Sequence, residues 1–225
     1  MVVEPHQMLT MRQIVNKDLQ KYLSIVDEYY SSEAFPNDPN LDREKVLSLL
    51  SDKLKVAWHA ADLTAEVWGH LVLSFRNKAW VRFVRNWDKA TPHTYKLIVG
   101  IEPDNGDPPC SIVVFLSFIG RQIGMLYVDT LAAGSNNRPF YDHSRNSGNS
   151  FPISFASYSP LNKLHKKYSA EILEEVIKFF PDFTLFESQF ADYKVKGVQT
   201  EEDYFVDIDL FMIFFERGLP AGVPT

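Results

Sequence analysis

The chain has 225 residues, of which 45% are hydrophobic and 14% aromatic, and its formal net charge is −6. This length and apolar content are enough to bury a core without disulfides or bound metal, which excludes an intrinsically disordered chain. The acidic balance argues against nucleic acid as a partner, because proteins that neutralise phosphates are usually basic.

Cys110 is the only cysteine, so neither an intramolecular disulfide nor a thiolate metal cage can form. Residues 1–10 lack the positive charge and apolar run of a secretory signal. The longest apolar run, residues 110–120, is too short to cross a membrane. These features predict a soluble, cytoplasmic protein that has no membrane partner.

The first part of the chain is predicted to be mainly helical. Residues 17–30 place leucine, valine and tyrosine at helical spacing. Two prolines within residues 31–40 end that helix. Asn40 is placed to cap a second helix, whose apolar stripe ends at Leu54.

Residues 62–75 fit a helix capped by Asp62, since apolar residues recur every four positions from Leu63 to Phe75. Their β-branched and aromatic side chains keep a strand as the alternative. The choice between helix and strand therefore stays open over residues 62–87.

The middle of the chain is predicted to form an antiparallel meander. Three runs rich in valine, isoleucine and phenylalanine lie at residues 94–103, 110–118 and 124–132. The turn between the first two contains Asn-Gly and Pro-Pro pairs, which favour a chain reversal. Residues 151–158 place large apolar side chains at every second position, so we expect a fourth strand there.

Two helices are predicted after the sheet. Ser159 and Pro160 form a typical helix start, an apolar stripe follows at helical spacing, and Pro181 ends the helix. Residues 201–218 fit both helix and strand templates, and we expect a helix that stops at Gly218.

These elements predict an α+β fold: N-terminal helices, a central antiparallel β-meander, and C-terminal helices packed on the sheet. We expect a single domain over residues 1–225, with a mainly helical part at 1–90 and the sheet with its helices at 91–225.

Basic and aromatic residues are interleaved in residues 75–87. The basic ones are Arg76, Lys78, Arg82 and Arg85. As a helix, the stretch would have a basic stripe beside a tryptophan stripe, so we interpret it first as a solvated face over an aromatic core. Contact with a protein is the second interpretation, because Trp and Arg are frequent interface anchors. Nucleic acid comes last, given the acidic remainder of the chain.

A polar loop after the third strand of the meander carries a candidate acid/base site. Its residues are Asp129, Tyr141, Asp142, His143 and Arg145. Histidine titrates near neutral pH, and an adjacent carboxylate can orient its ring. Asp129 joins the others only if the loop folds back. The set matches no catalytic signature, so a solvent-exposed loop is the favoured interpretation and an enzyme site the alternative.

Acidic residues dominate the end of the chain. Residues 168–225 hold twelve Asp and Glu against four Lys and Arg, whereas residues 71–100 hold six basic residues and one acid. The carboxylates do not follow a calcium loop and the histidines do not form H-E-x-x-H, so we expect no metal and no cofactor. An acidic surface of this kind attracts a basic partner by electrostatic steering.

In size, acidic charge, aromatic content and layout, the chain resembles the immunity proteins of bacterial polymorphic-toxin systems. The resemblance implies a non-enzymatic protein that neutralises a cognate toxin, often a basic nuclease domain, by occluding its active site. It rests on no shared motif, so no family site residue can be transferred to this chain. We predict that the partner contacts an acidic, aromatic segment comprising Glu201, Glu202, Asp203, Tyr204 and Asp207.

Overall fold

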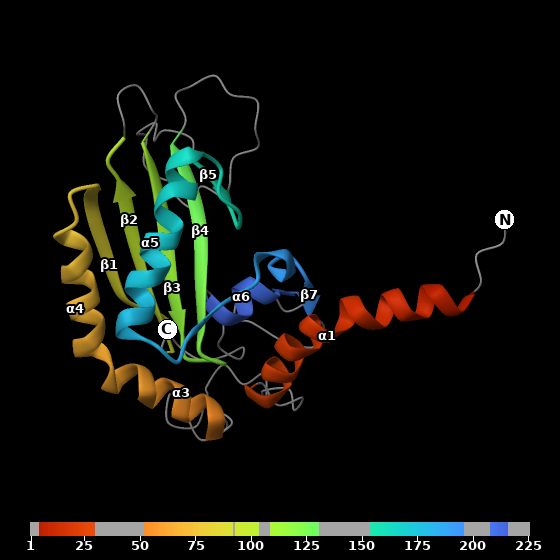
Figure 1. The fold of residues 1–225 in the computed structure, drawn as a ribbon. Helices are drawn as coiled ribbons and strands as arrows, with labels where there is room; N and C mark the ends of the chain where they lie inside the picture. The colour runs from red at the N-terminus through yellow and green to blue at the C-terminus, as the bar shows by residue number, and fades with distance from the viewer. Residues whose placement is uncertain are drawn as a thin grey trace, which may run out of the picture.

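The structure of the chain is a computed structural model. The described residues are 5–29, 52–91, 93–103, 109–130, 154–195 and 208–215. They form an α+β fold in which helices cover a mostly antiparallel sheet (Figure 1).

The sheet has the order β1-β2-β3-β4-β5, with every neighbouring pair antiparallel. Its strands are β1 (Val81–Thr91), β2 (Thr94–Ile101), β3 (Cys110–Ser117), β4 (Gln122–Thr130) and β5 (Ser154–Ser157). A sixth strand, β6 (Thr184–Leu185), pairs in parallel with the start of β4. A separate two-stranded ladder joins β7 (Lys194–Val195) to β8 (Ile208–Asp209).

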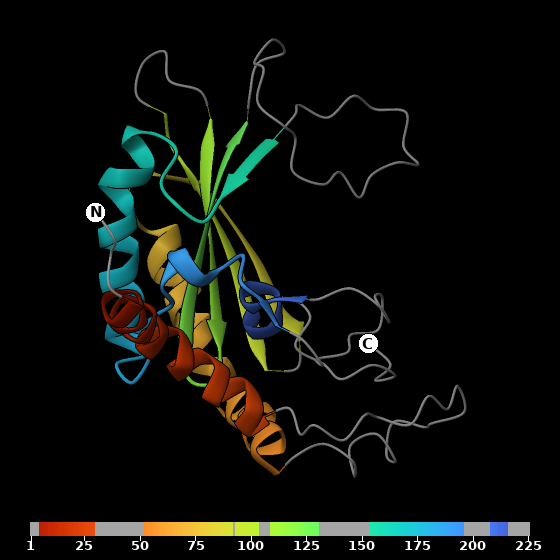
Figure 2. The same ribbon diagram turned by 90° about the vertical axis from the view of Figure 1, so that its right-hand side faces the viewer.

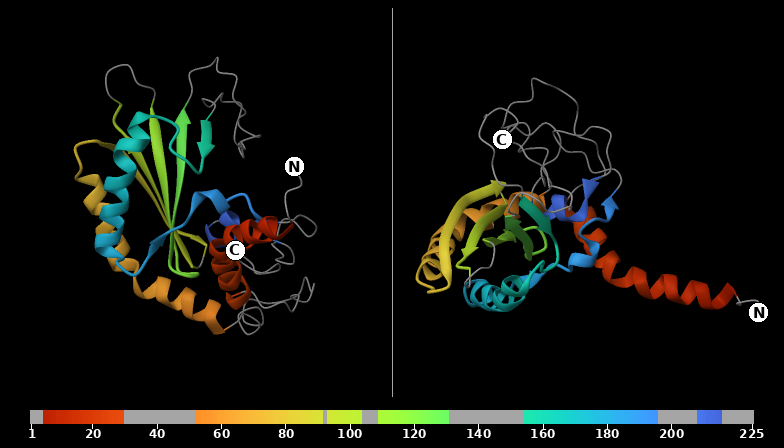
Figure 3. Two further views of the ribbon diagram at one scale, coloured as in Figure 1. Left: turned by 45° about the vertical axis from the view of Figure 1, so that its right-hand side comes forward. Right: turned by 90° about the horizontal axis from the view of Figure 1, so that it is seen from above.

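Helices cover both faces of the sheet. Figure 2 shows α4 (Ala65–Arg76) and α5 (Lys163–Phe179) on one face and α6 (Leu210–Phe215) on the other. α3 (Asp52–Leu63) leads into α4, and the 3-10 turn η1 (Ser188–Phe190) follows β6. The long α1 (Pro5–Tyr29) extends outward from the sheet (Figure 3).

Two apolar cores result from the alternation of side chains along the strands. Leu97 and Val114 face α4 and α5, where Trp68 stacks on Tyr95 with ring centroids 4.8 Å apart. Phe115 faces the opposite way and packs against the phenylalanines of α6. β3 is buried on both faces along most of its length, whereas one face of β2 carries Lys96 and is only partly buried there.

The predicted meander is confirmed, since β2, β3 and β4 coincide with the three apolar runs. The described part of the expected fourth strand is β5. The helix expected over residues 17–30 is the end of α1, which begins much earlier at Pro5. Leu54 is buried in α3 as expected, whereas Asn40 lies outside the described residues.

A helix is correct for residues 65–76, and Leu71 and Phe75 of its predicted apolar stripe are buried, but its predicted start is wrong. Asp62 belongs to the end of α3, and Thr64 precedes the first turn of α4. Leu63 of the predicted stripe is 71% exposed, whereas Trp68, which was not predicted to be buried, joins the buried face. Trp68 turns inward because its ring stacks on Tyr95 and its indole N–H donates to Asn86 at 2.8 Å.

Residues 81–91 form a strand, so the helical interpretation of the basic stretch is wrong there. The pairing of β1 with β2 is irregular between Val81 and Phe83. The Phe83 ring packs over Gly100, whereas Val84 packs against the core on the other face of the sheet, which contains Trp68. Because side chains alternate along the strand, Arg85 lies on the same face as Phe83. This irregularity hides the simple alternation by which a strand is recognised in a sequence.

α5 begins three residues later than the Ser159–Pro160 signal predicts. Asn162 caps it by accepting the backbone N–H of His165 at 2.8 Å. The backbone N–H of Ser159 instead donates to the Ser157 hydroxyl at 3.0 Å. The predicted end before Pro181 is confirmed, since the helix stops at Phe179.

The helix expected over residues 201–218 is correct only in part. Its described residues form strand β8 followed by α6, which begins at Leu210. The Asp209 side chain accepts the backbone N–H of Met212 at 2.8 Å and so caps α6.

Candidate functional site

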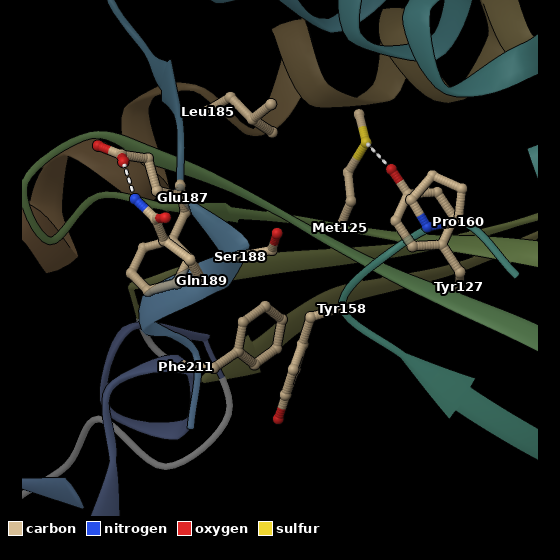
Figure 4. Close-up of a pocket in the computed structure, with 10 residues that line it drawn as sticks. Met125, Tyr127, Tyr158, Pro160, Leu185, Glu187, Ser188, Gln189 and Phe211 are labelled. Carbon is tan, nitrogen blue, oxygen red and sulfur yellow. Dashed lines mark hydrogen bonds between the residues drawn. The ribbon is translucent and has the colours of Figure 1, made fainter. Parts of the chain in front are cut away.

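A pocket of about 340 Å³ lies at the edge of β4. Figure 4 shows its lining side chains converging from separate regions of the chain. They are Met125 and Tyr127 from β4, Tyr158 and Pro160 from the segment before α5, residues 185–189, and Phe211 from α6. The volume is at the lower end of the roughly 300–1,000 Å³ typical of small-ligand pockets.

The pocket coincides with a gap in the pairing of β4. At one end of β4, β5 pairs with Tyr127 through Thr130. At the other end, β6 pairs with Gln122 and Ile123. Among the described residues, no strand pairs with 124–126 on that edge, so the pocket occupies the place of a missing strand segment.

Within the gap, the backbone of Met125 faces outward. The carbonyl groups of Arg121 and Ile123 accept N–H groups from the β6 segment at 3.0 and 2.9 Å. In a strand, the N–H and C=O of one residue point the same way, and alternate residues point to the same edge. Met125 therefore directs its N–H and C=O into the pocket, whereas Gly124 and Leu126 direct theirs toward β3.

The walls are mainly aromatic and come from both faces of the sheet. Tyr158 and Phe211 pack with ring centroids 4.6 Å apart. Tyr127 directs its hydroxyl toward the Met125 sulfur, 3.6 Å away (Figure 4). Burial raises the pKa of Tyr127, so its hydroxyl stays protonated at neutral pH.

Glu187 is the only charged residue that lines the pocket. Its carboxylate accepts a hydrogen bond from Gln189 at 2.8 Å, and its backbone N–H donates to the Tyr22 hydroxyl at 3.0 Å. Burial and the nearby Glu187 charge both raise the pKa of Tyr22. Within the described chain, no lysine, arginine or histidine pairs with Glu187.

A second cluster lies near the start of α5 and brings Asp129 together with Cys110 and His165. Cys110 and Asp129 are register partners on adjacent strands, and His165 packs over them. One ligand-type atom of each residue lies within 4.8 Å of the others. Asn162 donates a hydrogen bond to the Asp129 carboxylate at 2.6 Å.

The hydrogen bonds of this cluster favour a structural role. The Nδ1 atom of His165 accepts the backbone N–H of Leu161 at 3.3 Å, which places the proton on Nε2. Nε2 then donates to the Ser111 carbonyl at 3.1 Å and lies 3.6 Å from Asp129. Neither ring nitrogen offers a free lone pair, which a metal ligand or a general base requires.

Burial is the largest influence on the pKa values of His165 and Asp129. It lowers the pKa of His165, although the Asp129 charge opposes that change. It raises the pKa of Asp129, although His165 and Asn162 oppose it. The His165–Asp129 contact is therefore a neutral imidazole beside a carboxyl group rather than an ion pair at neutral pH.

Part of the basic stretch serves the fold. Lys78 pairs with Glu175 at 3.0 Å, and Trp80 donates its indole N–H to Glu171 at 2.8 Å. Trp80 also stacks on Tyr168 with ring centroids 4.3 Å apart. These contacts fix β1 and its approach to α5. The first interpretation, a solvated face over an aromatic core, is therefore correct for Trp80, whereas Lys78 pairs with a buried carboxylate.

Most of the site residues predicted from sequence lie outside the described residues. This is so for the acidic segment Glu201, Glu202, Asp203, Tyr204 and Asp207, and for Tyr141, Asp142, His143 and Arg145 of the loop. Only Asp129 is described, and its partners there are Asn162 and His165. The strand-edge pocket was not predicted, because it depends on which distant segments pair with β4.

Comparison of the chain with protein-family models, with curated proteins and with solved structures found no match. None of the described helices contains an apolar stretch that would cross a membrane.

Proposed function

We propose that the chain is a non-enzymatic binding protein of the inhibitor type, which holds a protein partner at the strand-edge pocket and covers that partner's active site. The observation that supports this proposal is the outward-facing backbone of Met125 in a gap between two strands. An unpaired strand edge is a common binding element for a second chain.

The composition of the pocket favours binding over catalysis. Its lining contains apolar and aromatic side chains, of which Tyr127 and Tyr158 carry hydroxyls, together with Ser188, Gln189 and one carboxylate at Glu187. A general acid/base mechanism needs a titrating group together with a second group that positions or activates it. In the lining, Glu187 is hydrogen-bonded to the neutral amide of Gln189 but has no second titrating or cationic group beside it, and His165 is fully buried outside the pocket.

The acidic segment at 201–207 remains a predicted contact for the same partner. Acidic side chains would attract a basic partner, such as a toxin or nuclease domain, and replace the phosphates of its substrate. The partner's chemistry is thus expected to be complementary to the overall charge of −6.

Photo-cross-linking in the native host tests the proposal. A benzophenone amino acid placed at Gln189, on the pocket rim, should give a covalent adduct with one partner protein. The same amino acid at Ala170, an exposed position of α5, is the matched control. The purified partner should then lose its activity on binding this chain. Equal cross-linking at both positions, or a partner that stays fully active, would reject the proposal.

A further inference from the structure

We infer that the pocket binds a short extended tip of a partner protein, which pairs its own main chain with Met125 and places a basic side chain at Glu187. This inference rests on the proposed function and specifies the partner segment that it requires.

The main-chain part follows from the geometry of β4. Met125 has one donor and one acceptor directed at the gap, and β5 and β6 occupy the same edge on either side. A peptide group in extended conformation offers the complementary acceptor and donor at the same spacing. It thereby completes the edge in the way that an added strand does.

The length of the gap limits the size of the segment. Residues 124–126, which pair with no described strand at this edge, cover about 10 Å at roughly 3.3 Å per residue. Because β5 and β6 block both ends, a long strand cannot continue along the edge. The occupant is therefore two or three residues at a loop tip or a chain end.

The walls and the rim define the side chains of this segment. Tyr158 and Phe211 form an aromatic wall that accepts an apolar side chain. Glu187 supplies the only charge of the lining and has no cationic partner within the described chain. A lysine or arginine of the segment would form a charge-assisted hydrogen bond there.

Selection from a displayed library of random linear peptides tests this inference without a known partner. The full-length chain is the bait, and peptides are counter-selected on Ser188→Trp, which fills the pocket. Ala170→Trp is the control for the added indole. Enriched peptides should share a basic residue next to an apolar one, bind the Ala170→Trp variant normally, and lose at least tenfold in affinity on Ser188→Trp.

Two further measurements distinguish the main-chain contact at Met125 from the charge contact at Glu187. Methylation of one backbone nitrogen in an enriched peptide should weaken binding roughly tenfold, as the loss of one main-chain hydrogen bond predicts. Glu187→Gln should weaken binding several-fold and reduce its salt dependence, whereas Asp192→Asn, an exposed acid nearby, should not.

The inference is wrong if no peptide is enriched, or if enriched peptides bind Ser188→Trp or tolerate methylation at every backbone nitrogen. A partner cross-linked at Gln189 in that case would leave the proposed function standing and reject only the strand-like mode. Peptides that behave as expected, without any cross-linked partner, would support the binding mode and reject the inhibitor function.

Discussion

The ammonium group of Lys78 lies 3.0 Å from a carboxylate oxygen of Glu175, which comes 97 residues later in the chain. Glu175 is only 8% exposed, and it also accepts a hydrogen bond from Lys178. Burial opposes its ionisation, but the hydrogen bonds of Lys78, Ser74 and Lys178 lower its pKa. The pair connects the turn between α4 and β1 to α5.

Lys78→Met should therefore lower the free energy of unfolding by about 1–2 kcal/mol, because it leaves a mostly buried carboxylate with weaker partners. Arg82→Met, an exposed position on the same stretch, should change it by less than about 0.5 kcal/mol. Urea unfolding of both variants measures the difference. Equal effects would show that the Lys78 contact does not stabilise the fold.

Asn162→Ala should destabilise the protein by roughly 1–2 kcal/mol, because it removes the cap of α5 and the hydrogen bond to Asp129 together. Ser159→Ala, at the helix start expected from sequence, should have little effect. Thermal unfolding compares the two variants. A larger loss from Ser159→Ala would mean that α5 begins at the position that the sequence suggests.

Protonation of the buried His93 should destabilise the folded protein in acid. Burial lowers its pKa from 6.5 to about 3, so the unfolded chain binds a proton that the folded chain excludes. Above pH 6.5 the His93 ring is neutral in both states and does not change the free energy of unfolding. As the pH decreases from 6.5 toward 3, the free energy of unfolding falls by up to roughly 5 kcal/mol. His93→Phe should flatten the pH dependence of unfolding over this window, whereas His59→Phe, an exposed position, should not. An unchanged slope in His93→Phe would contradict the assignment.

The sequence predicts those parts of the fold that have local signals. β2, β3 and β4 are continuous apolar runs, and Pro181 stops α5 where expected. The choice between helix and strand stayed open over β1 because its irregular register near Arg82 disturbs the alternation and its exposed residues are charged. Such features depend on tertiary pairing that no short window contains.

The candidate site depends even more than the fold on tertiary contacts that a local stretch of sequence does not contain. Asp129 was selected for its position at the end of a strand, but its partners Asn162 and His165 come from a helix 33 or more residues away. The pocket depends on Ile123 pairing with Leu185 while Met125 pairs with nothing described at that edge. A gap in strand pairing leaves no pattern in composition or spacing.

Hydrogen exchange at the backbone amide of Met125 tests the central claim most directly. NMR of the 15N-labelled protein resolves this amide from those of Gly124 and Leu126, which face β3. If Met125 faces an unpaired edge, its amide exchanges at least about a hundredfold faster than those two neighbours, and a partner or selected peptide slows it. Equal protection of all three amides in the free protein would show that the edge is already paired and contradict the account.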